Sequence, residues 1–272
     1  MKTTDMPLWP GVPPLWNSAH TGPYPFLEWY PAGRVIRPCV AIFPGGGYSR
    51  LAPHEGEGYA RFWNAEGFHA AVIHYRTQCE AGPQPLREGP LYDAMRAIRV
   101  LRANAASLGI DPDRVAISGS SAGGHLAASL AVHGANAESP PEEDLAAVNP
   151  VPNAAILAYP VITAGEFVHG GSFWNLCGEG GSDPERRAYF CLENHVSAST
   201  PPTFLWHTVE DAAVPVENAM LFAQALRRAG RPFELHLFAR GRHGVGLASD
   251  IPGTNAWPRL AVAWLCQQFA AD

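Results

Sequence analysis

Apolar runs and amphipathic stretches alternate along most of the chain. Short continuous apolar runs bounded by turn residues predict buried parallel strands, and we expect them at 39–43, 70–75, 114–117, 154–159, 203–207 and 233–238. Apolar residues at helical spacing predict amphipathic helices between these strands, at 57–65, 91–106, 216–228 and 257–269. Strands that alternate with helices in this way predict an α/β fold with a mostly parallel central sheet and helices on both faces.

Three stretches fall outside this alternation. Residues 1–25 are rich in proline and tryptophan and predict an extended arm, followed by an edge strand at 26–30. Residues 134–150 predict a surface loop. Residues 163–200 combine glycine, serine and aromatic residues without clear periodicity, which predicts a loop segment over the carboxyl edge of the sheet. This segment is too short for a large cap domain, and no linker or repeat divides the chain, so we expect residues 1–272 to form one domain.

Composition argues against several classes of partner. The net charge is −6, from 19 basic and 25 acidic residues, and no basic block stands out, which argues against nucleic acid. No apolar stretch has the length of a signal-peptide core or a membrane span, so we expect a cytoplasmic protein, or a secreted one if a signal was removed. The cysteines are odd in number and lack Cys-x-x-Cys spacing, which argues against a disulfide framework or a zinc site. They are Cys39, Cys79, Cys177, Cys191 and Cys266.

The stretch Gly119-Ser120-Ser121-Ala122-Gly123 is the most informative part of the sequence. It fits Gly-x-Ser-x-Gly between an apolar run and small helix-forming residues, a pattern in which a strand turns sharply into a helix with the central serine at the tip. Such a serine has a strained backbone, so its neighbours two positions away must lack bulk. Ser121 is therefore the candidate nucleophile. A glycine- and serine-rich turn without a catalytic role is the alternative.

A nucleophilic serine needs a base and a group that orients the base. In a fold of this kind they follow in the order Ser, acid, His, each on a loop after a later strand. Asp211 lies on the loop after the 203–207 strand, and His243 lies on the loop after the 233–238 strand. Taken singly, Asp211 could cap a helix and His243 could be an ordinary loop residue. Their joint placement predicts a triad of Ser121, His243 and Asp211.

Residues 44–48, Pro-Gly-Gly-Gly-Tyr, directly follow a predicted buried strand. Glycines at such a place let backbone N–H groups approach a ligand closely. We expect the N–H groups of Gly46 and Gly47, together with that of Ala122 after the nucleophile, to form an oxyanion hole. A phosphate-binding loop is the alternative, but the Lys and Ser/Thr that such a loop needs are missing.

At these motifs the chain resembles the α/β-hydrolase family of small acetyl esterases and acetylxylan or feruloyl esterases. Besides the Ser121 motif, the resemblance rests on residues 44–48, 54–57, 75–76, 92–94, 159–162, 200–204, 211–215 and 241–246, and it covers about residues 35–270. Related esterases carry His-Gly-Gly-Gly where this chain begins with Pro44, and two glycines where it has Gly241-Arg242. The resemblance implies hydrolysis of carboxylic esters, typically acetyl groups on sugars or small alcohols, with no cofactor.

We therefore expect a serine carboxylesterase that acts on short-chain esters, such as acetylated sugars or xylan fragments, with neither a cofactor nor a metal. Tyr48, Phe173 and Trp174 are candidate substrate contacts, although the two aromatic residues in 163–200 could equally shield the site. A peptidase of the prolyl-oligopeptidase type shares the Ser, Asp, His order, but such enzymes usually carry a large extra domain. A non-catalytic binding protein of the same fold is a third alternative.

Other polar residues are expected to serve the fold. Arg76 and Asp93 are predicted to form a buried structural pair, and His125 and His207 to be packed structural histidines. For His54-Glu55, bracing of the glycine loop and contact with substrate are both open. The histidines as a group lack the spacing with carboxylates that a metal site would show.

Overall fold

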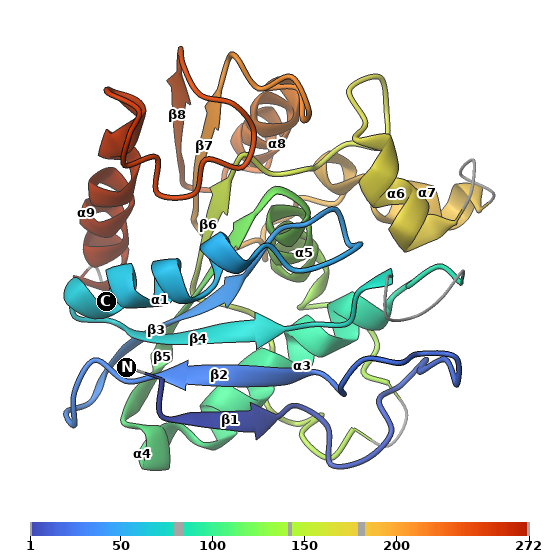
Figure 1. The fold of residues 1–272 in the computed structure, drawn as a ribbon, viewed down its shortest axis with the longest axis vertical. Helices are drawn as coiled ribbons and strands as arrows, with labels where there is room; N and C mark the ends of the chain where they lie inside the picture. Colours follow the sequence, from blue (N-terminus) through green and yellow to red (C-terminus); the bar gives the residue numbers. More distant parts are fainter. Residues whose placement is uncertain (1, 79–83, 141–142, 179–182, 271–272) are drawn as a thin grey trace.

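The computed structural model describes residues 2–78, 84–140, 143–178 and 183–270. Cys79 lies outside these ranges, as do short parts of the three stretches set apart above. An eight-stranded sheet runs through the described residues in the order β1-β2-β4-β3-β5-β6-β7-β8 (Figure 1). Its strands are β1 (Thr4–Pro7), β2 (Phe26–Tyr30), β3 (Arg37–Phe43), β4 (His69–His74), β5 (Ile110–Ser120), β6 (Ala154–Ala158), β7 (Thr203–Thr208) and β8 (Phe233–Phe238).

The pairing of these strands confirms the predicted sheet. The strands from β3 to β8 pair parallel with their neighbours, whereas β2 pairs antiparallel with both β1 and β4. Parallel strands end at the same edge, so the loops after β3, β5, β7 and β8 all leave from the carboxyl edge of the sheet. This edge carries the motifs that the sequence singled out.

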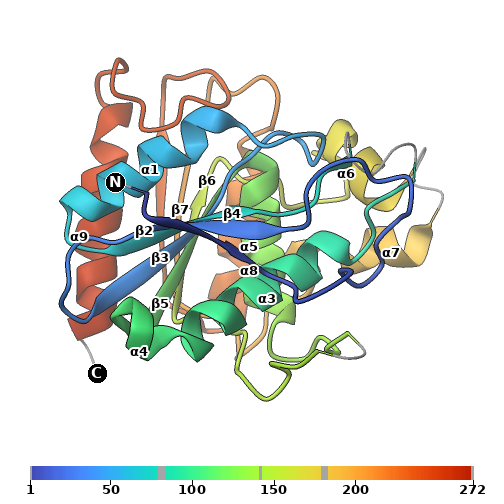
Figure 2. The same ribbon diagram turned by 60° about the horizontal axis from the view of Figure 1, so that its bottom comes forward.

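Helices cover both faces of the sheet (Figures 1 and 2). One face carries α1 (Glu57–Ala65) and α9 (Trp257–Ala270), and the other carries α3 (Gly89–Ala103), α5 (Ser121–His133) and α8 (Glu217–Arg228). The shorter helices are η1 (Pro53–Glu55), α4 (Ala105–Leu108), α6 (Gly170–Cys177), α7 (Pro184–Tyr189), η3 (Leu192–Asn194) and η4 (Thr254–Ala256). Within the described ranges, no helix combines the length and the apolar character needed to cross a membrane.

The sheet separates two apolar cores because successive residues of a strand face opposite sides. In β3, Val40 and Ile42 belong to the core beneath α1 and α9, while Ala41 and Phe43 belong to the core beneath α3 and α5. Strands buried on both faces are apolar throughout, which is why continuous apolar runs could predict them.

The structure of the N-terminal arm shows that the prediction of an edge strand at 26–30 is wrong. Its residues Thr4–Pro7 form β1 and pair with β2, so β2 is not an edge strand. The predicted buried pair is confirmed and fastens the arm: the Arg76 guanidinium donates two hydrogen bonds to Asp93, of 2.6 and 2.7 Å, and the Arg76 N–H donates a third of 3.1 Å. Trp9 Nε1 donates to Asp93 Oδ1 at 2.8 Å, and Arg76 also donates to the carbonyl oxygen of Pro14.

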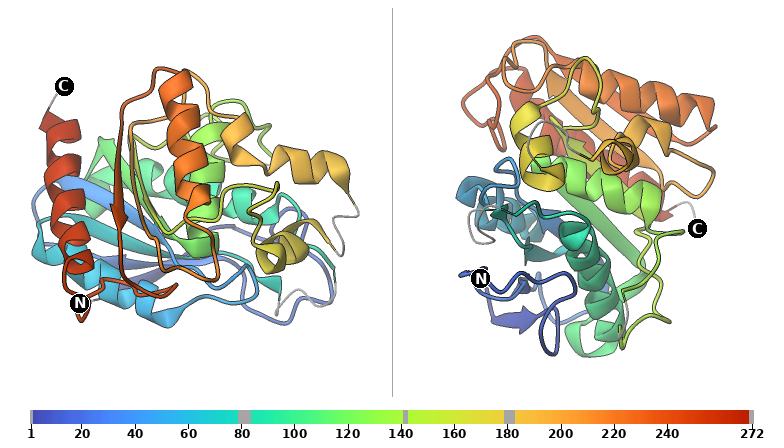
Figure 3. Two further views of the ribbon diagram at one scale, coloured as in Figure 1. Left: turned by 90° about the horizontal axis from the view of Figure 1, so that it is seen from above. Right: turned by 90° about the vertical axis from the view of Figure 1, so that its right-hand side faces the viewer.

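The prediction of a loop at 163–200 is also wrong, because the segment contains the helices α6, α7 and η3. Each of the two α-helices begins at a side-chain cap: His169 accepts a hydrogen bond from the Ser172 N–H, and Asp183 accepts one from the Arg186 N–H. Apolar side chains of the segment, Phe173, Leu176, Phe190 and Leu192, are buried in the core beside α5. Figure 3 shows the segment in yellow and gold against α5 in green. Tertiary packing and caps, rather than a periodic pattern, stabilise these short helices.

Candidate active site

The turn from β5 into α5 places Ser121 at the carboxyl edge of the sheet. Ser121 has a φ of 55°, in the left-handed region that serine rarely adopts. A Cβ atom at Gly119 would lie 2.2 Å from the Gly123 carbonyl oxygen, and a Cβ atom at Gly123 would lie 2.0 Å from that of Phe43. Both distances are far below van der Waals contact, so the turn can form only because neither residue has a side chain. This is the strained turn that the sequence predicts.

Asp211 and His243 come from the loops after β7 and β8, and the structure brings both to Ser121. His243 Nδ1 lies 2.6 Å from Asp211 Oδ2, and His243 Nε2 lies 2.8 Å from Ser121 Oγ. Because a carboxylate can only accept, the imidazole hydrogen belongs on Nδ1, which leaves Nε2 to accept the hydroxyl hydrogen of Ser121. A chain of this kind can remove a proton from serine while the oxygen attacks a carbonyl carbon.

The carboxylate of Asp211 is fully buried and accepts hydrogen bonds on both oxygens. Oδ1 accepts from the N–H groups of Ala213 and Val214, at 3.0 and 2.9 Å. Burial alone would raise the pKa of Asp211, but hydrogen bonds from His207, His243 and the Val214 N–H outweigh it and hold the pKa well below its ordinary value. Asp211 therefore remains ionised beside His243.

A second histidine contacts the same carboxylate. His207 Nε2 lies 3.2 Å from Asp211 Oδ2 and 3.0 Å from the Val214 carbonyl oxygen. Both of these atoms accept, so the imidazole hydrogen belongs on Nε2, while the buried Nδ1 has no hydrogen-bond partner among the described residues. His207 thus has the structural place predicted for it, but it also orients Asp211. The only sequence signal for this role is the position of His207 four residues before the acid.

The glycine loop, residues 44–48, is held from three directions. Three side chains make hydrogen bonds with its backbone: one just after β4, one in η1 and one in α6. They are Tyr75 Oη to Pro44 O at 2.5 Å, Gly45 N to Glu55 Oε2 at 2.7 Å, and Asn175 Nδ2 to Gly47 O at 2.9 Å.

This loop packs directly against Ser121. A Cβ atom at Gly45 would lie only 2.9 Å from Ser121 Cβ, so no side chain fits between them. Across the described part of the chain, no residue accepts a hydrogen bond from the N–H of Gly46, Gly47 or Ala122. These three N–H groups are those predicted for an oxyanion hole, and they are available to a ligand.

Glu55 links the glycine loop to the His243 loop. Its carboxylate is 2% exposed, and while Oε2 accepts from Gly45 N–H, Oε1 accepts from Tyr159 Oη at 2.6 Å. Tyr159 Oη accepts in turn from the Gly246 N–H at 3.1 Å, and the tyrosine ring lies edge-on to His243 with 5.2 Å between centroids. Both oxygens of Glu55 are occupied, so the structure favours bracing over substrate contact. The sequence analysis included Tyr159 in the motif 159–162 but did not predict this role for it.

Tyr48 and Phe173 do not have the substrate-facing positions that the sequence suggested. Tyr48 is 1% exposed, and its hydroxyl lies 2.8 Å from His125 Nδ1. Phe173 is 4% exposed and packs edge-on against the same histidine. His125 Nε2 donates to the Phe190 carbonyl oxygen, and burial lowers the pKa of His125 to about 4, so the ring is neutral. Both aromatic side chains therefore belong to the core, where they join the glycine loop, α5 and α6.

His169 caps the beginning of α6. Burial lowers the pKa of His169, His243 lowers it further, and Asp211 opposes the shift. Trp174, further along α6, is 56% exposed, and its role as a substrate contact stays a prediction. His169 could not be found from the sequence, because its place depends on how 163–200 packs.

Within the described ranges, no three His, Cys, Asp or Glu side chains are grouped so that they could hold a metal ion. The four described cysteines are free, and Cys177 and Cys191 of the 163–200 segment are not bridged.

Comparison with known proteins decides the family. The sequence profile of the prolyl oligopeptidase family matches residues 58–272, which include Ser121, Asp211 and His243. The chain belongs to the prolyl oligopeptidase family. This family shares the α/β-hydrolase fold, and the predicted fold class is confirmed.

Relatives of this chain carry esterase and xylanase names. Endo-1,4-beta-xylanase B of Butyrivibrio fibrisolvens is 43% identical over 216 residues, which make up 79% of this chain and 34% of that protein. The acetylxylan esterase of Xylanibacter ruminicola is 35% identical over 229 residues, which make up 82% of this chain and 43% of that protein. The chain thus spans less than half the length of these two curated relatives.

A solved structure matches over nearly its whole length. The acetyl ester-xyloside bifunctional hydrolase of Caldicellulosiruptor lactoaceticus superposes with a TM-score of 0.91 at 41% identity, covering 98% of this chain and 96% of the other. The resemblance to small acetyl and acetylxylan esterases is therefore confirmed.

Proposed function

We propose that this protein is a serine carboxylesterase that removes acetyl and similarly short acyl groups from sugar hydroxyls, such as those of xylan fragments. One observation carries the mechanism: His243 Nε2 lies 2.8 Å from Ser121 Oγ while Nδ1 is bonded to a buried carboxylate. The sugar ester is supported by the names of the relatives, an acetylxylan esterase and an acetyl ester-xyloside hydrolase.

In the proposed reaction, Ser121 Oγ attacks the ester carbonyl carbon as His243 Nε2 takes the hydroxyl proton. The negative charge that develops on the carbonyl oxygen is stabilised by the N–H groups of Gly46, Gly47 and Ala122. His243 then gives its proton to the leaving sugar oxygen, and an acyl-enzyme forms on Ser121. Water attacks this ester with His243 again as the base, which releases the acid and restores the serine.

Release of acid from a panel of acetylated and feruloylated oligosaccharides tests this proposal. We expect acetate from acetylated xylo-oligosaccharides and little ferulate, because the segment predicted over the site is too short to build a large acyl pocket. The alternative is a peptidase, which would share the family and the order of Ser121, Asp211 and His243. A prolyl aminoacyl-arylamide is the substrate that tests for this activity. Faster cleavage of the arylamide than of every acetyl ester would contradict the proposal.

The length of the acyl chain should strongly affect hydrolysis. A long chain gains about 0.8 kcal/mol per buried methylene only where an apolar channel receives it. The sequence predicts that the segment 163–200 covers the site, but its Phe173, Leu176 and Phe190 are buried in the core and are not free to line a channel. We expect kcat/KM to fall by about tenfold or more from p-nitrophenyl acetate to the octanoate, a loss of the size that pocket contacts produce. Equal values for the two esters would refute a small acyl pocket.

Replacing Glu55 should slow the reaction without abolishing it. In Glu55→Gln, one of the two acceptor oxygens becomes an NH₂ group, which cannot accept from Gly45 N–H or Tyr159 Oη as the carboxylate does, so the link between the glycine loop and Tyr159 is weakened. Full loss of one oxyanion donor costs about 10²–10³ in kcat, so we expect a smaller loss of about tenfold, with KM nearly unchanged. Glu57→Gln is the matched control, because Glu57 is exposed and pairs with Arg61. A loss confined to thermal stability, with unchanged kcat, would show that Glu55 serves only the fold.

A further inference from the structure

Arg242 directly precedes His243, at a position where related esterases have a glycine. The loop explains why a glycine is needed at the preceding position: Gly241 has a φ of 138°, and a Cβ atom there would lie 3.0 Å from Thr208 Cγ2. Arg242 is not among the residues with a positive φ, and its side chain is exposed. The backbone therefore requires neither a glycine nor an arginine at 242, and the significance of the arginine lies in what its side chain can contact.

The guanidinium group of Arg242 lies beside the proposed base. Its Nη1 donates to the His243 carbonyl oxygen at 2.9 Å, and this is its only hydrogen bond within the described ranges. Glu210 contacts the same loop, but its carboxylate accepts from the Gly241 N–H, and no described carboxylate forms an ion pair with Arg242. A guanidinium carries five N–H groups in one plane. Arg242 therefore keeps its charge and most of its donors available to a ligand.

The proposed reaction places the alcohol part of the ester against this loop. His243 Nε2 gives its proton to the leaving oxygen, so the leaving sugar must lie in contact with the imidazole. The carbonyl oxygen of the ester points instead to the N–H groups of Gly46, Gly47 and Ala122. Because the imidazole and the carbonyl oxygen of His243 belong to one residue, a guanidinium bonded to that carbonyl lies within reach of substituents on the leaving sugar.

A cation at this place favours a sugar that carries a negative charge. The planar fork of an arginine pairs with a carboxylate through two parallel hydrogen bonds. The chain as a whole has a net charge of −6, which repels an anion unless a local cation attracts it. Sugars with a carboxylate are the uronic acids, and glucuronic acid has the ring of xylose with a carboxylate in place of one hydrogen at C5.

We propose that Arg242 is a specificity-determining residue that gives the enzyme a preference for acetyl esters of acidic sugars, in which a uronic-acid carboxylate lies near the acetylated hydroxyl. The proposal rests on the proposed function, since it assigns the alcohol side of the same ester. Arg242 binds the carboxylate and takes no part in proton transfer. The carboxylate is remote from the reacting atoms, so the contact is equally strong in the ground state and the transition state, and it should lower KM without changing kcat.

Three methyl glycosides, each acetylated at the same ring hydroxyl, test this preference by release of acetate. They are the xyloside, the glucuronide, and the uncharged amide of the glucuronide, which matches the glucuronide in size. The wild type should have a kcat/KM for the glucuronide about fivefold above that for the amide, as expected for an exposed ion pair, with the difference in KM. Salt at about 1 M should largely remove this preference by screening.

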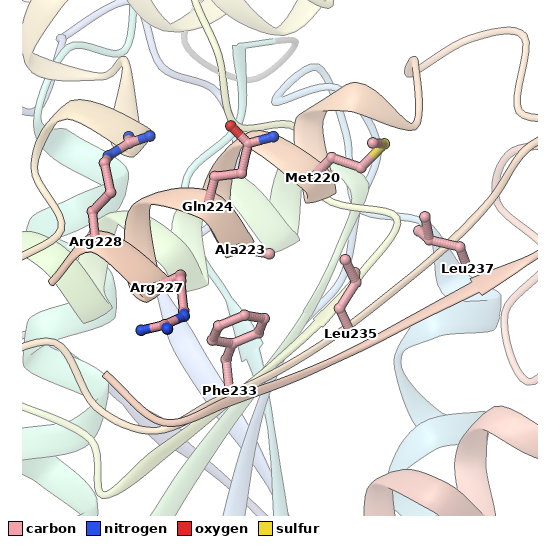
Figure 4. Close-up of a pocket in the computed structure, with 8 residues that line it drawn as sticks. All are labelled: Met220, Ala223, Gln224, Arg227, Arg228, Phe233, Leu235 and Leu237. Atoms are coloured by element: carbon pink, nitrogen blue, oxygen red, sulfur yellow. The ribbon is translucent and has the colours of Figure 1, made fainter. Parts of the chain in front are cut away.

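The ratio of glucuronide to amide should fall to about one in Arg242→Gln and below one in Arg242→Glu. Since both substrates are compared on the same variant, general damage to the site lowers both values and leaves the ratio unchanged. Arg228→Gln is the matched control. Arg228 is also exposed, but it lies in the last turn of α8 just before β8 begins, at the amino edge of the sheet and beside an apolar groove (Figure 4). This control should keep the wild-type ratio.

Equal values for the glucuronide and its amide in the wild type, with the xyloside hydrolysed, would overturn this proposal and leave the proposed esterase function intact. A preference for the glucuronide that survives in Arg242→Gln would also overturn it, because another group would then bind the carboxylate. Release of acetate from none of the three glycosides would contradict the proposed function itself, and the role of Arg242 with it.

Discussion

Ser121→Ala should leave a folded protein whose ester hydrolysis is slower than that of the wild type by about 10⁴-fold or more. The alanine side chain has no oxygen to attack the carbonyl carbon, so no acyl-enzyme can form. The N–H groups of Gly46, Gly47 and Ala122 remain, so the variant should still hydrolyse the ester faster than the uncatalysed reaction in water. The measurement is kcat/KM for p-nitrophenyl acetate, with circular dichroism and thermal melting to show that the fold is intact.

Ser118→Ala is the matched control for this variant. It removes a hydroxyl group of the same kind from β5, the strand that leads into Ser121, and Ser118 Oγ is buried without a hydrogen-bond partner in the described structure. We expect its activity to match that of the wild type within about twofold, as a change that removes no interaction should. If Ser121→Ala retains more than about a tenth of the wild-type rate, Ser121 is not the nucleophile.

Asp211→Asn should lower kcat by about 10⁴-fold, by analogy with the serine-protease triad in which the acid fixes the tautomer of the histidine. The carboxylate accepts from His243 Nδ1 and also from His207 and two N–H groups. Asparagine has a single acceptor oxygen, which the N–H groups of Ala213 and Val214 hold. Its NH₂ group then faces His243 Nδ1, so the imidazole hydrogen moves to Nε2, which can no longer accept the proton of Ser121.

Glu210→Gln tests the neighbouring acid on the same loop. Glu210 Oε2 accepts from the Gly241 N–H at 3.0 Å, and a glutamine oxygen can accept the same hydrogen bond. We therefore expect a loss of less than about tenfold, as for an exchange between neutral and charged acceptors at a partly exposed site. If Glu210→Gln were the more damaging of the two variants, the acid of the triad would be Glu210.

The sequence predicted the parallel strands and the residues at their carboxyl ends because both depend on local patterns. A strand buried on both faces is an apolar run, and parallel strands end at one edge, so residues far apart in the chain could be placed together. β1 was missed because Thr4–Pro7 is short and mostly exposed, and it joins the sheet through its backbone. The helices of 163–200 were missed because their stability comes from caps and from packing against α5.

Within the site, the sequence could indicate residue types but not which side chains are buried. Tyr48 and Phe173 stand beside the predicted site in the sequence, yet both turn into the core and pack on His125. Glu55 and Tyr159 are 104 residues apart, and only the fold shows that they share a hydrogen bond. Buried polar networks of this kind depend on tertiary contacts, so a single sequence carries no local signal for them.

Labelling with a fluorophosphonate is the most direct test of the central claim that Ser121 is an activated nucleophile. The reagent reacts with a serine whose hydroxyl is deprotonated by a neighbouring histidine, and peptide mapping by mass spectrometry locates the label. The structure predicts one label per chain, on the peptide that contains Ser121, with loss of ester hydrolysis in proportion and no label in Ser121→Ala. Unlabelled protein that still hydrolyses esters, or a label on another residue that accompanies the loss of activity, would contradict the account.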